Sequence, residues 1–432
     1  MKFIKLKYIN WIIGLIVVGI VLYKGLILKA DSSGFITAQP IRSAGYPLVI
    51  LLFNIIFGKF ALKVLFVTQP VLILISIHYF LDFLKLKFKL TDFIILLISP
   101  LFYFYLYRIG GYIMSDPLSL VFLLLSIKFL LEAVFDNNQK AMFIFYINLI
   151  ILVLIRGQFY FLYPVTIFVV LFLYFKNRDL KSLVKNMVYL LVVIVLTNVL
   201  DKTYHYVKHN RFISTPYTGL QLVTDALYVS KASDSILFKN NEREMFKKIS
   251  TNIMEQGLTM DQIKIQNPAV EWTEVIFHYT NSYNDICHRN AKVIIGSYFN
   301  DPENIDYWKN IDNITLNMAR KIILKHPKEF FKLYIYDILR NGFFSNIYFI
   351  FFMLILIISL GTVYKDPENK IYLFLVLSSL IVISNLLLVA LVEPVLDRYS
   401  FYANILYYTS LFIVVANEYL FHQKINNKEE SI

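Results

Sequence analysis

Residues 343–363 have the sequence FFSNIYFIFFMLILIISLGTV, which contains no aspartate, glutamate, lysine or arginine. A helix of about 20 mostly apolar residues is long enough to cross the hydrocarbon core of a bilayer. Comparable apolar stretches recur along the chain, at approximately 9–28, 61–84, 91–107, 116–135, 141–155, 159–175, 184–200, 371–392 and 401–420. The sequence therefore predicts an all-α polytopic membrane protein with about ten transmembrane helices.

The composition supports the same class of protein. Hydrophobic residues make up 58% of the 432 residues and charged residues 17%, and the mean hydropathy is +0.60. A soluble domain could not cover that much apolar surface with so few charges, so we expect a lipid bilayer around most of it. The net charge of +12 does not indicate nucleic acid, because the cations lie in short clusters between apolar runs. The single cysteine, Cys287, excludes an intrachain disulfide.

The positions of the cations predict the orientation of the chain. Lysines and arginines gather in alternate loops: Lys85, Lys87, Lys89, Lys140, Lys176, Arg178, Lys181, Lys185, Lys365 and Lys370. Loops rich in lysine and arginine face the cytoplasm, so we expect a multi-pass protein with both termini cytoplasmic. The abundance of Lys, Asn, Ile, Phe and Tyr suggests a bacterial source, and therefore the inner (plasma) membrane.

Two segments predicted to face outward are long. The first outer loop, at about 29–60, contains the apolar stretch 48–57, which is short for a span and which we interpret as an interfacial helix. The alternative is an eleventh span, which would invert every later loop. The second segment, 201–342, is polar and interrupted by prolines, and it predicts a small helical extracytoplasmic domain. It separates an N-terminal transmembrane module (1–200) from a C-terminal module with a cytoplasmic tail (343–432).

Ionisable residues gather near the predicted outer ends of the spans. Such residues are costly in a membrane and indicate a functional site by default. They come from different hairpins but share one predicted depth, so we expect them to meet in one extracytoplasmic site: Asp31, Arg42, Arg108, Asp116, Arg156, Glu393, Asp397 and Arg398.

Four of these residues also have a purely structural interpretation. Asp31 is either a helix cap or solvated carboxylate, or a general base made more basic by partial desolvation. Asp116, beside Pro117, fits the first turn of a helix. Arg156 either reaches lipid headgroups or binds substrate. Arg398 either pairs with Asp397 or is presented to a phosphate.

The pattern resembles the GT-C superfamily of polytopic membrane glycosyltransferases, and most closely its protein O-mannosyltransferase and aminoarabinose-transferase branch. The matching segments are Asp31 in the first outer loop, Arg42 to Leu48, Met114 to Leu118, Arg156-Gly157, and Asp397-Arg398-Tyr399. The chain departs from that branch in two places. No second acid lies between Asp31 and Arg42, and glycine rather than proline follows Arg156.

The resemblance implies an inverting glycosyltransferase that moves a sugar from a polyprenyl-phosphate donor to a glycan, lipid or protein acceptor. Asp31 would be the catalytic base, and cations would stabilise the leaving phosphate. Asp116 would orient the acceptor or bind a divalent cation, although no His/Asp/Glu cluster favours a metal. The substrate-binding residues would be Arg42, Arg108, Asp116, Arg156, Glu393, Asp397, Arg398 and Tyr399.

Other functions remain open at the level of sequence. A flippase or other transporter of polyprenyl-linked glycans would place ionisable residues deep in the spans, where His78 and Lys128 are the few candidates. A polysaccharide polymerase or ligase would rely on outer arginines more than on Asp31. A non-catalytic scaffold would use the 201–342 domain to bind a partner.

Overall fold

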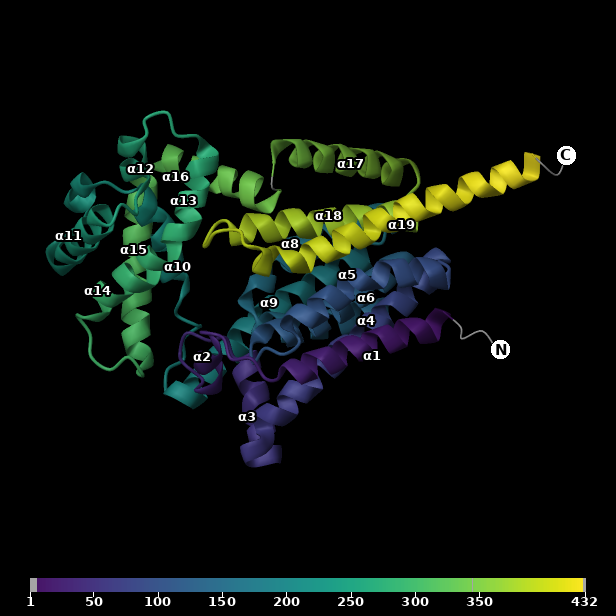
Figure 1. Cartoon of the computed structure of the whole chain (residues 1–432), viewed down its shortest axis with the longest axis horizontal. Helices are drawn as coiled ribbons and strands as arrows, with labels where there is room; N and C mark the ends of the chain where they lie inside the picture. Colours follow the sequence, from purple (N-terminus) through teal and green to yellow (C-terminus); the bar gives the residue numbers. More distant parts are fainter. Residues whose placement is uncertain (1–5, 344, 430–432) are drawn as a thin grey trace.

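The computed structural model describes the backbone of residues 6–343 and 345–429, and side chains as far as residue 418. Almost all of this part is helical, and its one β-bridge joins Ile27 to Tyr112. The long apolar helices form one bundle (Figure 1). They are α1 (Leu6–Lys24), α4 (Ala61–Phe88), α5 (Asp92–Ile109), α6 (Ser115–Asp136), α7 (Gln139–Ile155), α8 (Leu162–Asn177), α9 (Leu180–His209), α17 (Asn346–Lys365), α18 (Lys370–Val389) and α19 (Asp397–Glu429).

The prediction of an all-helical polytopic membrane protein is confirmed. Within the described residues, nine helical segments are long and apolar enough to cross a bilayer. The predicted span at 141–155 corresponds to α7, which has 17 residues and falls just short in length. α7 packs along α6, and the 3-10 turn η2 (Gly157–Phe161) links it to α8. α1 begins and α19 ends at the same end of the bundle (Figure 1).

The first long loop contains two short helices, α2 (Ser32–Ile36) and α3 (Gly45–Phe57), followed by the 3-10 turn η1 (Gly58–Phe60). α3 has 13 residues, which span about 20 Å and cannot cross a bilayer. Gly58, with φ of 52°, separates α3 from α4. α3 runs across the direction of the bundle helices (Figure 1). This direction favours a helix at the membrane surface over an eleventh span.

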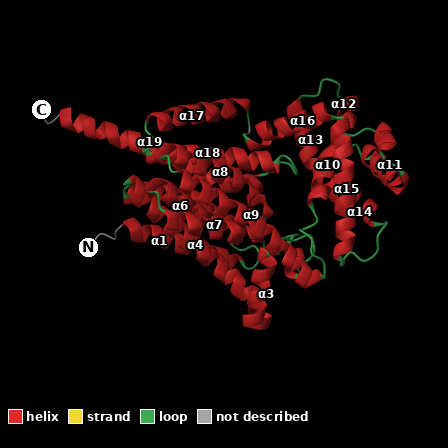
Figure 2. Cartoon of the chain, turned by 180° about the vertical axis from the view of Figure 1, so that it is seen from behind, coloured by secondary structure: helices red, strands yellow, loops and turns green. Residues whose placement is uncertain are grey.

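The remaining helices form a unit at the other end of the bundle from the start of α1 (Figures 1 and 2). We call this unit the end domain. It has its own hydrophobic core, built around Phe246, Ile249, Ile311 and Ile322. Its elements are α10 (Thr218–Val229), η3 (Ala232–Leu237), α11 (Asn240–Glu255), α12 (Met260–Gln266), α13 (Trp272–Asn284), the π-helix η4 (Asp285–Ala291), α14 (Lys292–Gly296), α15 (Ile305–Lys325), α16 (Pro327–Asp337) and the π-helix η5 (Ile338–Gly342).

The helix that contains the predicted boundary at residue 201 does not end there. α9 continues without a break to His209, so Asp201 belongs to the bundle. The reason is local bonding at the end of α9. The Asp201 carboxylate accepts hydrogen bonds from the backbone N–H of Ala44, at 3.2 Å, and of Thr215, at 2.9 Å. A polar residue is therefore buried at the point where the hydropathy falls, and it ties the first loop to α9.

Candidate functional site

Asp31 lies directly before α2 and makes no capping hydrogen bond to that helix. Its carboxylate instead accepts hydrogen bonds from Arg42 Nη2, at 2.8 Å, and Arg398 Nη1, at 3.1 Å. The expectation that desolvation makes this group more basic is wrong for this arrangement. Burial raises the pKa of Asp31, but the charges and hydrogen bonds of Arg42 and Arg398 outweigh burial and hold the pKa below its ordinary value.

Asp116 lies in the first turn of α6, where the helix dipole favours a negative charge. That much agrees with a capping role, but the side chain has further partners. It forms ion pairs with Arg156 Nη1, at 2.8 Å, and with Arg398 Nη2, at 3.4 Å. The Tyr402 hydroxyl donates a third contact at 3.4 Å. The Asp116 side chain is only 3% exposed, so its charge depends on these guanidinium groups.

Arg156 does not reach for lipid headgroups, since its side chain is only 12% exposed. It lies between α7 and η2, and its Nε donates to Gln158 Oε1 at 3.0 Å. Gln158 Nε2 in turn donates to Asn385 Oδ1, at 2.8 Å, and to the Tyr399 carbonyl, at 2.6 Å. Arg156 is therefore held through Gln158, which bonds to α18 and α19.

Arg398 connects the two carboxylates, so five side chains form one chain of alternating charge. Its order is Arg42, Asp31, Arg398, Asp116, Arg156. These residues come from the first loop, α6, the α7–η2 junction and the start of α19. The sequence hypothesis placed them in one site, and the structure does bring these five together.

The remaining predicted site residues do not belong to the chain of alternating charge. Asp397 is exposed and has no ion-pair partner among the described residues, so the alternative pairing of Asp397 with Arg398 is not formed. Glu393 lies in the α18–α19 connection, and burial raises the pKa of its carboxyl. Tyr399 contributes its carbonyl to Gln158 and its ring to Arg156, whose guanidinium lies 5.5 Å from the ring centre.

A cavity of about 340 Å³ opens beside this chain of charges. Its polar lining includes Asp31, Asp116 and Arg398, and its apolar lining includes Met114 and Phe401. Lys29 and Arg108 also line it, and both are exposed. In the part of the chain that the structure describes, neither of these two cations has an ion-pair partner. The cavity thus combines two carboxylates that share one arginine, an apolar lining and two exposed cations.

The wall of this cavity is built by pairing the first loop with the α5–α6 turn. Ile27 N–H donates to the Gly111 carbonyl at 3.0 Å, and Ile113 N–H donates to the Ile27 carbonyl at 3.2 Å. A Cβ atom on Gly111 would lie 3.4 Å from the Gly25 carbonyl. A side chain at residue 111 would therefore make an ordinary van der Waals contact, and it is the two backbone hydrogen bonds that hold the start of the first loop against the turn after Arg108.

Sequence reasoning missed three contributors, namely Lys29, Gln158 and Tyr402. For two of them, the spacing in the sequence could have pointed to a role in the site. Lys29 is two residues before Asp31, and Tyr402 is one helical turn after Arg398, on the same face of α19. Gln158 had no such signal, because its role depends on Asn385 and Tyr399, which are more than 200 residues away in the chain.

The carboxylates do not fit a divalent cation. Arg398 lies between Asp31 and Asp116 and bonds to both, at 3.1 and 3.4 Å. Among the described residues, no group of three His, Cys, Asp or Glu side chains is suited to hold a metal ion. Compared with protein-family models, with curated proteins and with solved structures, this chain has no match.

Proposed function

We propose that this chain is a membrane glycosyltransferase that transfers a sugar from a polyprenyl-phosphate donor to an acceptor hydroxyl on the side of the bilayer where the end domain lies. One observation carries the proposal. Asp31 and Arg398 line one cavity at the end of an apolar helix bundle, together with Lys29 and Arg108, two cations that form no ion pair with any described residue. A lipid-linked phosphate needs cations at headgroup depth, and the transfer needs a carboxylate base close to them.

The residues that line the cavity would have different roles in the reaction. Lys29 and Arg108 would receive the donor phosphate first, and Arg398, which is bonded to Asp31 and Asp116 in the unliganded chain, would then turn toward it. The acceptor oxygen attacks the anomeric carbon as the bond from that carbon to the phosphate oxygen breaks. The acceptor proton passes to Asp31, and polyprenyl phosphate leaves with the electron pair. A single displacement of this kind inverts the anomeric centre.

The contacts of Asp31 add a condition to this mechanism. Two guanidinium groups hold the pKa of Asp31 below its ordinary value, so its carboxylate is a weak base in the unliganded chain. A phosphate that draws Arg398 toward itself weakens one of these two interactions. The pKa of Asp31 then rises, and the base becomes stronger only when the donor is bound.

The two intramembrane candidates for a transport pathway are occupied by neighbours. His78 Nε2 lies 3.0 Å from the Tyr103 hydroxyl, and its ring stacks on Trp11. Lys128 forms an ion pair with Glu132. These contacts favour structural roles for both residues and support the transferase over a flippase.

The test is sugar transfer in membrane vesicles supplied with polyprenyl-phosphate-linked sugars. Asp31→Asn should reduce glycosidic bond formation by about 100-fold or more, the usual effect of removing a general base. Asp397→Asn is the matched control, because Asp397 is exposed and does not line the cavity. Unchanged transfer by Asp31→Asn would refute the assignment. Movement of labelled lipid across sealed vesicles without any new glycosidic bond would indicate a flippase.

A separate binding measurement tests the phosphate site. In nanodiscs, Lys29→Ala and Arg108→Ala should each weaken binding of polyprenyl phosphate by about tenfold, since each removes one charged contact. Lys59→Ala, in the turn η1 and outside the cavity, should bind like the original chain. Equal affinity in all four proteins would place the phosphate elsewhere.

A further inference from the structure

The connection between α18 and α19, residues 390–396, is bonded to the end domain at two points. The Asp337 carboxylate, at the end of α16, accepts a hydrogen bond from the backbone N–H of Val395 at 3.1 Å. The Tyr283 hydroxyl, at the end of α13, donates to the Val392 carbonyl at 3.0 Å. Neither end-domain side chain lines the cavity beside Asp31.

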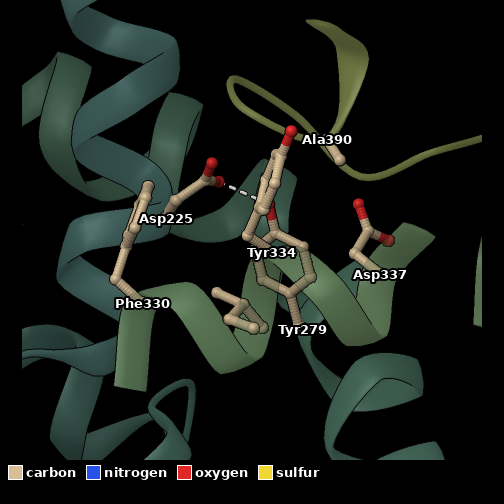
Figure 3. Close-up of a pocket in the computed structure, with 7 residues that line it drawn as sticks. Asp225, Tyr279, Phe330, Tyr334, Asp337 and Ala390 are labelled. Carbon is tan, nitrogen blue, oxygen red and sulfur yellow. Dashed lines mark hydrogen bonds between the residues drawn. The ribbon is translucent and has the colours of Figure 1, made fainter. Parts of the chain in front are cut away.

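The bond to Val395 lies in a closed environment. Asp337 is 1% exposed and Val395 is 3% exposed. Figure 3 shows Asp337 across a small pocket from Asp225 and beside Ala390, the first residue of the connection. The Asp225 carboxylate accepts a hydrogen bond from Tyr279, and Asn341 Nδ2 donates to Asp337 at 2.6 Å. Losing a buried acceptor here would leave the Val395 N–H without a partner, which is costly.

Both bonds come from places where the helix changes its winding. Tyr283 is followed within two residues by the π-helix η4, and Asp337 is followed directly by the π-helix η5. π-helical turns are rare and often occur at functional sites. Here each π-helix follows a side chain that bonds to the connection between α18 and α19.

That connection leads directly into the charged site. Val395 precedes Arg398 by three residues, and α19 begins at Asp397. On the bundle side, Gln158 and Asn385 donate to the Tyr399 carbonyl at 2.6 and 3.0 Å. The start of α19 is thus held from both sides, and Arg398 needs this placement to reach Asp31 and Asp116 together.

We propose that Asp337 and Tyr283 are positioning residues: through residues 390–396 they fix the Arg398 guanidinium between Asp31 and Asp116. The end domain thereby controls the geometry of the site without touching its ligand. The claim rests on the proposed function only for its effect on binding and transfer. Small displacements of a positioned group are enough to reduce activity strongly.

The first readout does not depend on any activity. The only native cysteine, Cys287, is fully buried, so a spin label can be placed on Leu396→Cys, a position that is 41% exposed. In this labelled chain, Asp337→Ala and Tyr283→Phe should each produce a mobile component in the spectrum. Asp337→Asn keeps an acceptor for Val395 and should restore the immobile spectrum.

Tyr334→Phe is the matched control. Its hydroxyl also belongs to the end domain, but it donates to the Leu387 carbonyl on α18, at 3.0 Å, rather than to the connection. This variant should leave the label immobile. Tyr283→Phe removes only a hydroxyl, so it tests the proposal even if Asp337→Ala does not fold.

The second readout is binding of polyprenyl phosphate in nanodiscs. Asp337→Ala and Tyr283→Phe should bind about tenfold more weakly, whereas Asp337→Asn and Tyr334→Phe should not differ from the unmodified chain. An immobile label in Tyr283→Phe, or a mobile label with unchanged binding, overturns the positioning role. If the unmodified chain binds no polyprenyl phosphate, the proposed function fails, and the label spectra alone decide whether these residues hold the connection.

Discussion

Arg398 lies between two carboxylates whose surroundings differ, so substitutions at Asp31 and Asp116 should have different consequences. The Asp31 side chain is 34% exposed and that of Asp116 is 3% exposed. Removing Asp116 leaves Arg156, whose side chain is only 12% exposed, without its carboxylate partner. Breaking a buried ion pair by removing one partner costs about 3–5 kcal/mol.

We therefore expect Asp116→Ala to lower the thermal unfolding midpoint strongly, while Asp31→Asn leaves it close to that of the unmodified chain. Both midpoints can be measured in detergent at neutral pH. Asp397→Ala, at an exposed position in the first turn of α19, controls for loss of one negative charge. A midpoint for Asp116→Ala that equals that of the control would show that the buried ion pairs do not stabilise the fold.

Arg398→Ala should affect binding rather than stability. Asp31 keeps Arg42 and Asp116 keeps Arg156, so each carboxylate retains one partner. We expect the fold to survive and binding of polyprenyl phosphate to weaken more than the rate of transfer. Isothermal titration in nanodiscs and single-turnover transfer separate the two effects. A large loss of rate at unchanged affinity would assign Arg398 to the transfer step instead.

The sequence was informative about which residues meet and less so about how they meet. The cost of charges near a membrane was enough to select Asp31, Asp116, Arg156 and Arg398. It could not show that Arg398 is shared by two carboxylates, because that depends on packing between α6 and α19. For the same reason, it predicted a more basic Asp31, whereas two guanidinium groups lower the pKa of Asp31.

At the scale of the element, apolar length predicted the bundle helices well, and it failed where polar residues are buried. α9 extends beyond the predicted end because Asp201 is bonded to the first loop and to Thr215. The direction of α3 depends on another local feature that hydropathy does not report. α3 starts at Gly45, and a Cβ atom there would lie 2.6 Å from the backbone of Leu154 and Ile155 in α7.

Gly45→Ala should therefore push α3 away from α7 and destabilise the protein, by about 1–3 kcal/mol if the strain resembles other overpacked sites. The control is Gly361→Ala in α17, where an added Cβ atom meets nothing within 4 Å. Alanine is favoured over glycine in a helix, so the control should be neutral or slightly stabilising. Equal unfolding midpoints for the two variants would mean that α3 does not need this close approach.

At the scale of the whole molecule, the end domain lies at one end of the bundle, and α1 begins at the other (Figure 1). The distribution of cations predicts that the loop around Lys181 is cytoplasmic and that the end domain is outside. Ile236→Cys, at a position that is 74% exposed in the end domain, should react with a membrane-impermeant maleimide in intact cells. Lys181→Cys should react only after the cells are opened. The reverse pattern of labelling would show that the end domain is cytoplasmic and that the predicted topology is inverted.

The junction of the end domain and the bundle should also respond to pH, because it buries carboxyl groups. Burial raises the pKa of Asp337 to about 7, and it raises the pKa values of the neighbouring Asp225 and Glu393 as well. Between the ordinary aspartate pKa and about 7, folded Asp337 binds more protons than unfolded Asp337. The folded state therefore loses stability as pH rises through this range.

An asparagine side chain does not titrate, so Asp337→Asn should abolish the contribution of this group to that loss. We expect the unfolding midpoint of Asp337→Asn, relative to the unmodified chain, to be higher at pH 8 than at pH 5. Comparing the two proteins at each pH cancels the titration of groups that do not interact with Asp337. The charge of Asp337 raises the pKa of Asp225, so the substitution also changes the titration of Asp225, and this change adds to the expected difference in the same direction. A difference between them that stays constant across this range would show that Asp337 is already ionised at pH 5, and that its bond to Val395 does not depend on pH.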